Sequence, residues 1–322
     1  MIYNIHPLLF EPILKERIWG GTKLNSVFDK KIISEYTGES WELSSVEGSE
    51  SVVSKGIYAN QTLNELIEKY AEEILGTTVL ARFGKQFPLL FKYLDAREAL
   101  SIQVHPNDEI AQKRHRSFGK TEMWYVVEAQ ENAKIIVGFE PKTTRQKLEL
   151  AIKNNKITSV LTEKTAKKGA VFFIKTGTVH AIGAGILIAE IQQTSDITYR
   201  IYDFDRKDAN GNSRELQLDL ALDAIDFDNK ETQVSYETVV DKTNKIVDCQ
   251  YFTTNIICLE TNFFVSKTQS SFTVYMCVAG NFEIKYNQQN YFYQKGDTIL
   301  IPATMTHFEL VGKATILEIF IK

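Results

Sequence analysis

KKGAVFFIKTGTVHAIGAGILIAEI, residues 167–191, contains short apolar segments separated by glycine turns, and the chain repeats this pattern near its C-terminal end. The stretch QKGDTILIPATMTHFELVGKATILEIF, residues 294–320, aligns with it by eye, and His307 stands over His180 at the same distance from the preceding glycine. Upstream of the two copies, MWYVVEAQENAKIIVG also matches TVYMCVAGNFEIKYNQ. A repeated order of strand, glycine turn, strand and histidine indicates a duplicated small β-barrel or jelly roll.

Other segments support a mainly β protein with helical insertions. Runs rich in β-branched and aromatic residues, bounded by Gly, Asn and Asp, predict strands in both halves of the chain. Helical periodicity appears in three places, at residues 63–76, 143–155 and 214–225. The polar stretch 229–250 lacks apolar clusters and is predicted to connect the two β-rich units.

Composition limits the class of protein. A chain of 322 residues can hold two core units, and 43% hydrophobic with 24% charged residues is ordinary for a globular protein. The net charge of −4 argues against binding nucleic acid through broad electrostatics. Residues 1–21 show no basic segment followed by a long apolar run, so we expect neither a secretory signal nor a membrane span. Three cysteines without CxxC spacing are interpreted as reduced thiols of a cytoplasmic protein.

Four side chains form a candidate metal site: Gln103 and His105 in SIQVHP, Glu122 in GKTEMWY, and His180 in TGTVHAIG. Residues two apart on a strand project from the same face, so Gln103 and His105 can converge on one ion. The same geometry puts Lys120 beside Glu122. Two imidazoles, a carboxylate and an amide oxygen suit a divalent ion such as zinc and leave room for a further oxygen ligand.

The second copy of the repeat lacks these ligands. Its histidine, His307, is preceded by no QxH sequence, and Thr273 falls near the position that Glu122 holds in the first copy. We therefore predict a metal site only in the N-terminal unit.

Several motifs together resemble the class I mannose-6-phosphate isomerases in their short bacterial form, which are cupins. The motifs that carry the resemblance are IWGGTKL (18–24), GESWELSS (38–45), FPLLFKYLDAREALSIQVHPND (87–108), GKTEMWYV (119–126), TGTVHAIG (176–183) and TYRIYDFDR (198–206). The resemblance covers essentially the whole chain. It implies two cupin-type jelly-roll β-barrels with helical insertions in the N-terminal unit: a catalytic metal-binding domain at residues 1–230 and a C-terminal cupin-like domain without a metal site at 231–322.

The resemblance also implies roles for individual residues. Gln103, His105, Glu122 and His180 match the zinc ligands of the family, one zinc ion per chain. Arg200 matches its catalytic arginine, although neighbouring acidic residues alone would explain Arg200 as part of an ion-pair network. The substrate-binding residues expected from the same comparison are Ser101, Lys120 and Lys92. Larger relatives carry an additional helical domain that has no counterpart here.

The implied reaction interconverts mannose 6-phosphate and fructose 6-phosphate through an enediol, which requires a base and stabilisation of negative charge on oxygen. Zinc would supply the stabilisation. Candidate bases are a hydroxide on the metal, a carboxylate beside it, or Lys120 with a lowered pKa. The expected partner is a small sugar phosphate, without nucleic acid or membrane, and the expected state is a monomer or weak homodimer.

Two other functions fit the same residues less well. A non-haem iron oxygenase could use His and Glu ligands on a β-barrel, but it would not need Lys120 or Arg200. A sugar sensor or structural protein could keep the fold without the chemistry, yet the first copy of the repeat retains every expected ligand together with Arg200.

Overall fold

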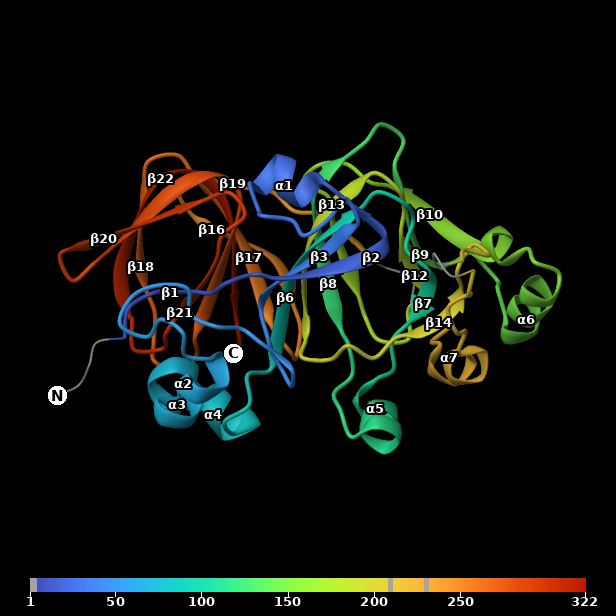
Figure 1. Cartoon of the computed structure of the whole chain (residues 1–322), viewed down its shortest axis with the longest axis horizontal. Coiled ribbons are helices and arrows are strands. Elements are labelled where there is room, and N and C mark those ends of the chain that lie inside the picture. Colours follow the sequence, from blue (N-terminus) through green and yellow to red (C-terminus); the bar gives the residue numbers. More distant parts are fainter. Residues whose placement is uncertain (1–4, 208–210, 229–231) are drawn as a thin grey trace.

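The computed structural model describes residues 5–207, 211–228 and 232–322, in which two β-rich units lie side by side (Figure 1). We call the unit with a seven-stranded and a five-stranded sheet the N-terminal β-unit, and the unit with an eight-stranded sheet the C-terminal β-unit. The prediction of a mainly β protein is confirmed. The predicted domain boundary between residues 230 and 231 lies outside the described residues, as does the start of the predicted connection 229–250.

Antiparallel pairing builds both sheets of the N-terminal β-unit. The seven-stranded sheet has the order β15 (Gln233–Val234), β11 (Val171–Ile174), β8 (Glu122–Ala129), β13 (Ile186–Gln193), β6 (Leu89–Ala96), β3 (Thr37–Leu43) and β2 (Ile13–Gly21). The five-stranded sheet has the order β10 (Leu161–Thr165), β9 (Lys134–Phe139), β12 (His180–Ile182), β7 (Ile102–Val104) and β14 (Tyr199–Tyr202). A short hairpin, β4 (Ser45–Val46) with β5 (Ser49–Glu50), follows β3.

One antiparallel sheet forms the C-terminal β-unit. Its main order is β1 (Leu8–Leu9), β21 (Thr298–Ile301), β19 (Thr273–Tyr286), β22 (His307–Phe320), β17 (Thr253–Leu259) and β16 (Thr243–Asp248). Two further strands extend it: β18 (Asn262–Ser266) pairs with β22, and β20 (Gln289–Gln294) pairs with β19. The first strand, β1, comes from the N-terminal end of the chain.

The seven-stranded sheet contributes apolar side chains to a separate hydrophobic core on each of its two faces. On β8, Trp124 and Val126 pack between the two sheets of the N-terminal β-unit, while Met123, Tyr125 and Val127 pack against the C-terminal β-unit. Successive side chains of a strand point to opposite faces, so one sheet can carry both apolar layers. The face that carries Trp124 also carries Glu122, which places this carboxylate between the two sheets.

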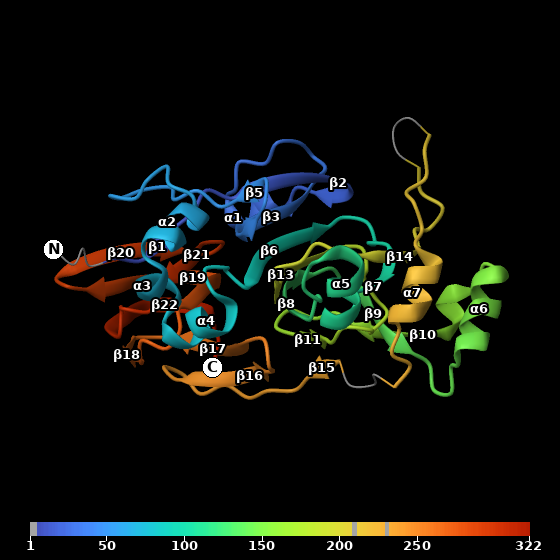
Figure 2. The same cartoon turned by 90° about the horizontal axis from the view of Figure 1, so that it is seen from below.

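Helices pack outside these layers. They are α1 (Lys23–Phe28), α2 (Leu63–Lys69), α3 (Ala71–Leu75), α4 (Thr77–Phe83), α5 (Asp108–His115), α6 (Arg145–Lys153) and α7 (Leu218–Ala224), with a 3-10 turn at Ile157–Val160. Apolar residues of α6 and α7 cover the outer face of the five-stranded sheet, at the right edge of Figure 2. None of the helices in the described ranges is long and apolar enough to cross a membrane.

The predicted helix at 63–76 is divided. It begins with a capping box, in which Thr62 accepts a hydrogen bond from the Glu65 amide at 3.1 Å and Glu65 accepts one from the Thr62 amide at 2.8 Å. It breaks at Tyr70 and again at Gly76, whose φ of +87° does not continue a helix. The predicted helices at 143–155 and 214–225 form as the shorter α6 and α7, whereas α1, α4 and α5 were not predicted.

The helices α2–α4 lie on the C-terminal β-unit, below it in Figure 1. The amide of Phe272 donates to the carbonyl of Leu75 at 3.0 Å, and the amide of Ala303 donates to that of Ile74 at 3.1 Å. The helices α2–α4, which come from the first hundred residues of the chain, therefore help to form the hydrophobic core of the C-terminal β-unit.

Candidate metal centre and substrate cleft

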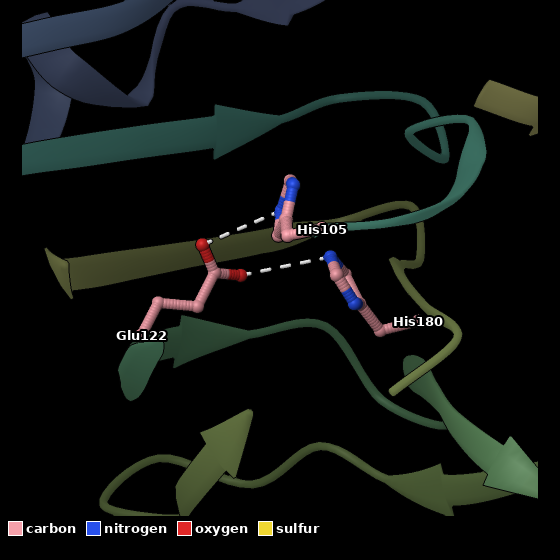
Figure 3. A group of neighbouring side chains, drawn as sticks. All are labelled: His105, Glu122 and His180. Carbon is pink, nitrogen blue, oxygen red and sulfur yellow. Dashed lines mark ion pairs between the residues drawn. The ribbon is translucent and has the colours of Figure 1, made fainter. Parts of the chain in front are cut away.

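Three predicted ligands meet between the two sheets of the N-terminal β-unit. His105 directly follows β7, His180 begins β12, and Glu122 begins β8. Their ligand atoms all lie within 4.8 Å of one another, and all three side chains are buried. Figure 3 shows them pointing toward one another: Nε2 of His105 lies 3.6 Å from Glu122 Oε2, and Nε2 of His180 lies 3.6 Å from Glu122 Oε1.

Both imidazoles are held with Nε2 turned to the centre. Nδ1 of His105 lies 2.9 Å from the carbonyl of Ile197, and Nδ1 of His180 lies 2.8 Å from the carbonyl of Thr178. A carbonyl only accepts, so each Nδ1 carries the proton and each Nε2 turns a lone pair toward the centre. Burial lowers the pKa of His180 to about 4, and burial together with Lys120 lowers the pKa of His105 well below its ordinary value. Both rings are therefore neutral at physiological pH, the form that binds a metal ion.

The carboxylate of Glu122 completes a donor set for a cation. Its Oε1 is fully buried and has no hydrogen-bond partner among the described residues. An unpartnered buried carboxylate oxygen is costly unless a positive group satisfies it. Two neutral imidazoles and this oxygen match the ligand types of a catalytic zinc site, so the residues fit a divalent metal ion.

Gln103 also reaches the centre. It lies opposite His180 and Arg200 in the register of the five-stranded sheet. Its Nε2 lies 3.3 Å from His180 Nε2, while its Oε1 accepts a hydrogen bond from Ser101 Oγ at 3.4 Å. In this arrangement the amide nitrogen, not the oxygen, faces the ligand atoms.

Lys120 lies beside the ligands, as the spacing predicts. Its Nζ is 2.5 Å from Glu122 Oε2 and 3.1 Å from His105 Nε2. Burial by itself lowers the pKa of Lys120, but Glu122 and Glu190 outweigh burial and raise it. The side chain is thus an ammonium here, and the expectation of a lowered pKa is wrong for this arrangement.

A cleft of about 520 Å³ lies next to the centre. Gln103 and Lys120, which contact the three ligands, are part of its lining, whereas the ligands themselves are not. The cleft is lined by Lys15, Arg17, Trp19, Glu39, Trp41, Lys92, Leu94, Leu100, Ser101, Gln103, Lys120, Trp124, Ile182, Glu190, Asp196, Thr198, Arg200 and Arg214. Six of these side chains are basic and three are acidic, so the cleft favours an anionic ligand. The structure brings all the residues predicted to bind substrate into this one cleft.

Arg200 faces the cleft from β14. Its Nε donates to Ser101 Oγ at 3.3 Å, and one terminal nitrogen donates to the carbonyl of Glu215 at 2.8 Å. Asp203 is instead bound by Arg206 and Arg214. Among the described residues Arg200 forms no ion pair with a carboxylate, so the local network does not account for its charge.

Lys92 enters the cleft from β6. Its Nζ lies 3.3 Å from Glu190 Oε2 and 4.7 Å from the centre of the Trp41 ring. Glu190 also accepts a hydrogen bond from Trp124 Nε1 at 3.0 Å. The Lys92 ammonium is held by a carboxylate and an aromatic face, which leaves part of its donor capacity open to the cleft.

One wall of the cleft contains Arg17 and Glu39, which the sequence reasoning missed. Arg17 donates two hydrogen bonds to Glu39, from Nε to Oε1 at 2.9 Å and from a terminal nitrogen to Oε2 at 3.0 Å. Trp41 Nε1 donates a third hydrogen bond to Glu39 at 2.7 Å. The alternation of GESWELS places Glu39 and Trp41 on one face and was the available signal. Glu42 faces away and pairs with Lys30 at 2.9 Å.

Comparison with protein families gives two matches. Residues 8–162 match the family described as phosphomannose isomerase type I, catalytic domain. Residues 242–321 match the family described as mannose-6-phosphate isomerase, cupin domain.

Individual relatives match over nearly their whole length. The chain is 39% identical to the mannose-6-phosphate isomerase ManA of Bacillus subtilis, over 96% of each chain. It is 36% identical to the mannose-6-phosphate isomerase of Streptococcus mutans, over 97% of each chain. The crystal structure of the mannose 6-phosphate isomerase from Bacillus subtilis superposes with a TM-score of 0.90 at 34% identity, covering 98% of this chain and 99% of that one.

Proposed function

The chain belongs to the type I phosphomannose isomerase family, and on this premise we propose that it interconverts D-mannose 6-phosphate and D-fructose 6-phosphate in the cleft above His105, Glu122 and His180. The observation that carries the proposal is the convergence of three buried metal-ligand side chains beside a cleft with an excess of basic side chains. Gln103 and Lys120 line this cleft and contact the ligands. A sugar phosphate needs both features: a positive environment for the phosphate and a site that polarises the sugar carbonyl.

The proposed cofactor is one zinc ion per chain, held by His105, Glu122 and His180 with Gln103 as the fourth ligand. The unpartnered Glu122 oxygen and the two imidazole lone pairs that face the centre support it. When bound, zinc would act as a Lewis acid that polarises the sugar carbonyl and favours the enediol route. Gln103 would need to turn its amide so that the oxygen faces the ion, because the amide nitrogen faces His180 here.

Side chains around the centre would bind and orient the sugar. Lys120, an ammonium beside the ligands, would donate to a sugar oxygen close to the reacting carbons. Arg200 would donate to the oxygens that gain negative charge during proton transfer, since its planar fork carries a permanent charge. Its hydrogen bond with Ser101 would keep the guanidinium in the cleft, with the Ser101 hydroxyl assisting in substrate binding.

Lys92 would provide a further substrate contact from the wall of the cleft. Its pairing with Glu190 and Trp41 fixes the position of the ammonium before substrate arrives. A preorganised cation loses little side-chain entropy when it binds a phosphate or a hydroxyl group.

We extend the proposal to the architecture. Both β-units would be cupin-type jelly-roll barrels, with the catalytic domain at residues 1–230 and the domain without a metal site at 231–322. The protein would act in the cytoplasm as a monomer or weak homodimer, without nucleic acid or membrane as partners, in keeping with its net charge of −4.

A coupled assay for fructose 6-phosphate formation tests the function. We expect activity on mannose 6-phosphate to disappear after treatment with a chelator and to return on addition of zinc. Inactivity of the zinc-loaded protein would overturn the proposal. Oxygen consumption by the iron-loaded protein without isomerisation would favour the oxygenase instead.

A further inference from the structure

The C-terminal β-unit contains a carboxylate in the same place as Glu190 of the cleft. Glu190 lies on β13 opposite Trp124 of β8, and Glu318 lies on β22 opposite Tyr275 of β19. In each unit the aromatic side chain donates to the carboxylate: Trp124 Nε1 to Glu190 at 3.0 Å, and Tyr275 Oη to Glu318 at 3.1 Å. The duplicated sequence has thus kept a buried carboxylate and its aromatic donor.

The two units also correspond in the strand that pairs with the other edge of the carboxylate-bearing strand, which is β6 beside β13 and β17 beside β22. Lys92 of β6 lies opposite Glu190, and Asn255 of β17 lies opposite Glu318. Lys92 contacts its carboxylate at 3.3 Å, and Asn255 Nδ2 donates to Glu318 Oε2 at 2.7 Å. The second unit therefore repeats the three-part arrangement with a neutral amide in place of the lysine.

This second arrangement opens into its own cavity of about 540 Å³, which shares no lining residue with the cleft. Its lining includes Glu318, Asn255, Lys267, Thr273, Phe264 and Phe320. Thr273 lies opposite Phe320 on β22, just as Glu122 lies opposite Gln192 on β13, so a threonine replaces the metal-ligand carboxylate. The cavity has the size of a small-molecule site but not the metal ligands.

The charges of the cavity are separated from one another. Lys267 Nζ donates to the carbonyl of Ser271 at 2.9 Å and to those of Pro302 and Ala303 at 3.4 Å, and burial lowers the pKa of Lys267 to about 8. Within the described residues, Lys267 and Glu318 form no ion pair with each other or with another side chain. Lys322 at the rim is bound to Asp248 at 2.5 Å. The cavity thus offers an anionic acceptor with unused capacity, Glu318, and an ammonium, Lys267, two of whose three hydrogen bonds are long and therefore weak.

We infer that this second cavity binds a neutral polyhydroxylated molecule of monosaccharide size. A hydroxyl group both donates and accepts, so a polyol can give a hydrogen bond to Glu318 and receive one from Lys267. An anion would be repelled by the Glu318 carboxylate, which forms no ion pair among the described residues, whereas Glu190 pairs with Lys92. Phe264, which is 64% exposed, offers an apolar face for the C–H side of a sugar ring.

Fluorescence can distinguish this cavity from the cleft. The chain has three tryptophans, and all of them, Trp19, Trp41 and Trp124, line the cleft. Phe264→Trp adds a reporter at the second cavity. Phe292→Trp is its matched control, because Phe292 is similarly exposed (72%) in the same unit and does not line the cavity.

The probe is D-mannose, titrated into the full chain. We expect a saturable change in the emission of Phe264→Trp that the wild type and Phe292→Trp do not show. Adding Glu318→Gln to Phe264→Trp should raise the apparent Kd roughly tenfold, because a charged acceptor is lost. If Glu318→Gln does not fold, Phe264→Ala, with Phe292→Ala as its control, should lose mannose binding measured by titration calorimetry.

Three results would overturn the inference: no saturable change in Phe264→Trp, the same change in Phe292→Trp, or an affinity that neither Glu318→Gln nor Phe264→Ala lowers. Tighter binding of inorganic phosphate than of D-mannose to the Phe264→Trp protein would overturn the assignment of a neutral ligand. The isomerase assay is independent of all these outcomes, because no residue changed lines the cleft.

Discussion

Arg200 and Ser101 are joined at the wall of the cleft, where Nε of the guanidinium donates to Oγ of the serine at 3.3 Å. The same serine hydroxyl donates to Gln103 Oε1 at 3.4 Å. Arg200 is thereby linked through one hydroxyl to a side chain that faces His180. This chain of contacts connects the proposed charge-stabilising group with the proposed metal centre.

Arg200→Ala should lower turnover of mannose 6-phosphate by roughly a thousandfold, because a preorganised charge next to a developing oxyanion is lost. Bound zinc, measured by metal analysis, should remain at one ion per chain. Arg114→Ala, which removes an arginine paired with Asp223 on the surface, is the matched control and should keep full turnover. Unchanged turnover in Arg200→Ala would remove Arg200 from the reaction.

His105→Ala should release zinc more readily than Gln103→Ala. An imidazole nitrogen is a strong ligand for zinc, whereas an amide oxygen is a weak one and the Gln103 amide nitrogen faces the site here. Competition with a chromophoric chelator measures the two zinc affinities directly. The reverse order would mean that Gln103 holds the ion and that the assignment of the four ligands is wrong.

The stability of the protein should depend on Glu39 at acid pH. Burial by itself raises the pKa of Glu39, but Lys92 and Arg17 with the hydrogen bond from Trp41 lower it from 4.5 to about 2. A carboxylate with a lowered pKa stabilises the folded state above its unfolded pKa, and this contribution is lost as the pH falls toward the folded pKa. Between about pH 5 and about pH 3 the free energy of unfolding of the wild type should fall by about 2 kcal/mol more than that of Glu39→Gln.

Urea unfolding of the two proteins across this pH range provides the measurement. Groups other than Glu39 titrate in both proteins, so their contributions cancel when the free energy of unfolding of Glu39→Gln is subtracted from that of the wild type. Parallel curves for wild type and Glu39→Gln would show that Glu39 titrates normally in the folded state.

Gly76→Ala should destabilise the protein more than Gly48→Ala. Both glycines have positive φ, +87° and +75°, so alanine is strained at either position by about 1–2 kcal/mol. At Gly76 the added Cβ would also lie 2.5 Å from the backbone carbon of Ser270, whereas no atom lies within 4 Å at Gly48. We expect an additional loss of about 2 kcal/mol for Gly76→Ala, from displacement of α3 and α4 on the C-terminal β-unit. Equal melting temperatures of the two variants would contradict a rigid contact there.

The repeat and the ligand pattern could be predicted from sequence because both depend on strand alternation. Side chains two apart share a face, so Lys120 with Glu122 and Gln103 with His105 were placed correctly near one centre. His180 lies on a third strand and could be added because its motif, TGTVHAIG, resembles that of the family.

The far wall of the cleft could not be predicted in the same way. Arg17 and Glu39 come together through the pairing of β2 with β3, whose register contains irregularities that no local pattern reports. The amide orientation of Gln103 and the raised pKa of Lys120 depend on groups from other strands. Such effects arise only when distant segments are placed in space.

The exchange of segments between the two β-units has a consequence for biosynthesis. Strand β1 and the helices α2–α4 leave the ribosome early, but their partners in β21, around Ser270 and at Ala303 are synthesised last. Until then the apolar side chains of Leu66, Ile67, Ile74 and Val79 lack the surface that buries them in the finished protein. Contacts of such long sequence separation form slowly and leave apolar surface open to aggregation. A nascent chain of this protein is therefore most vulnerable during the last stage of translation, when all the residues proposed for the metal centre and for substrate binding have been synthesised but the C-terminal β-unit cannot yet fold.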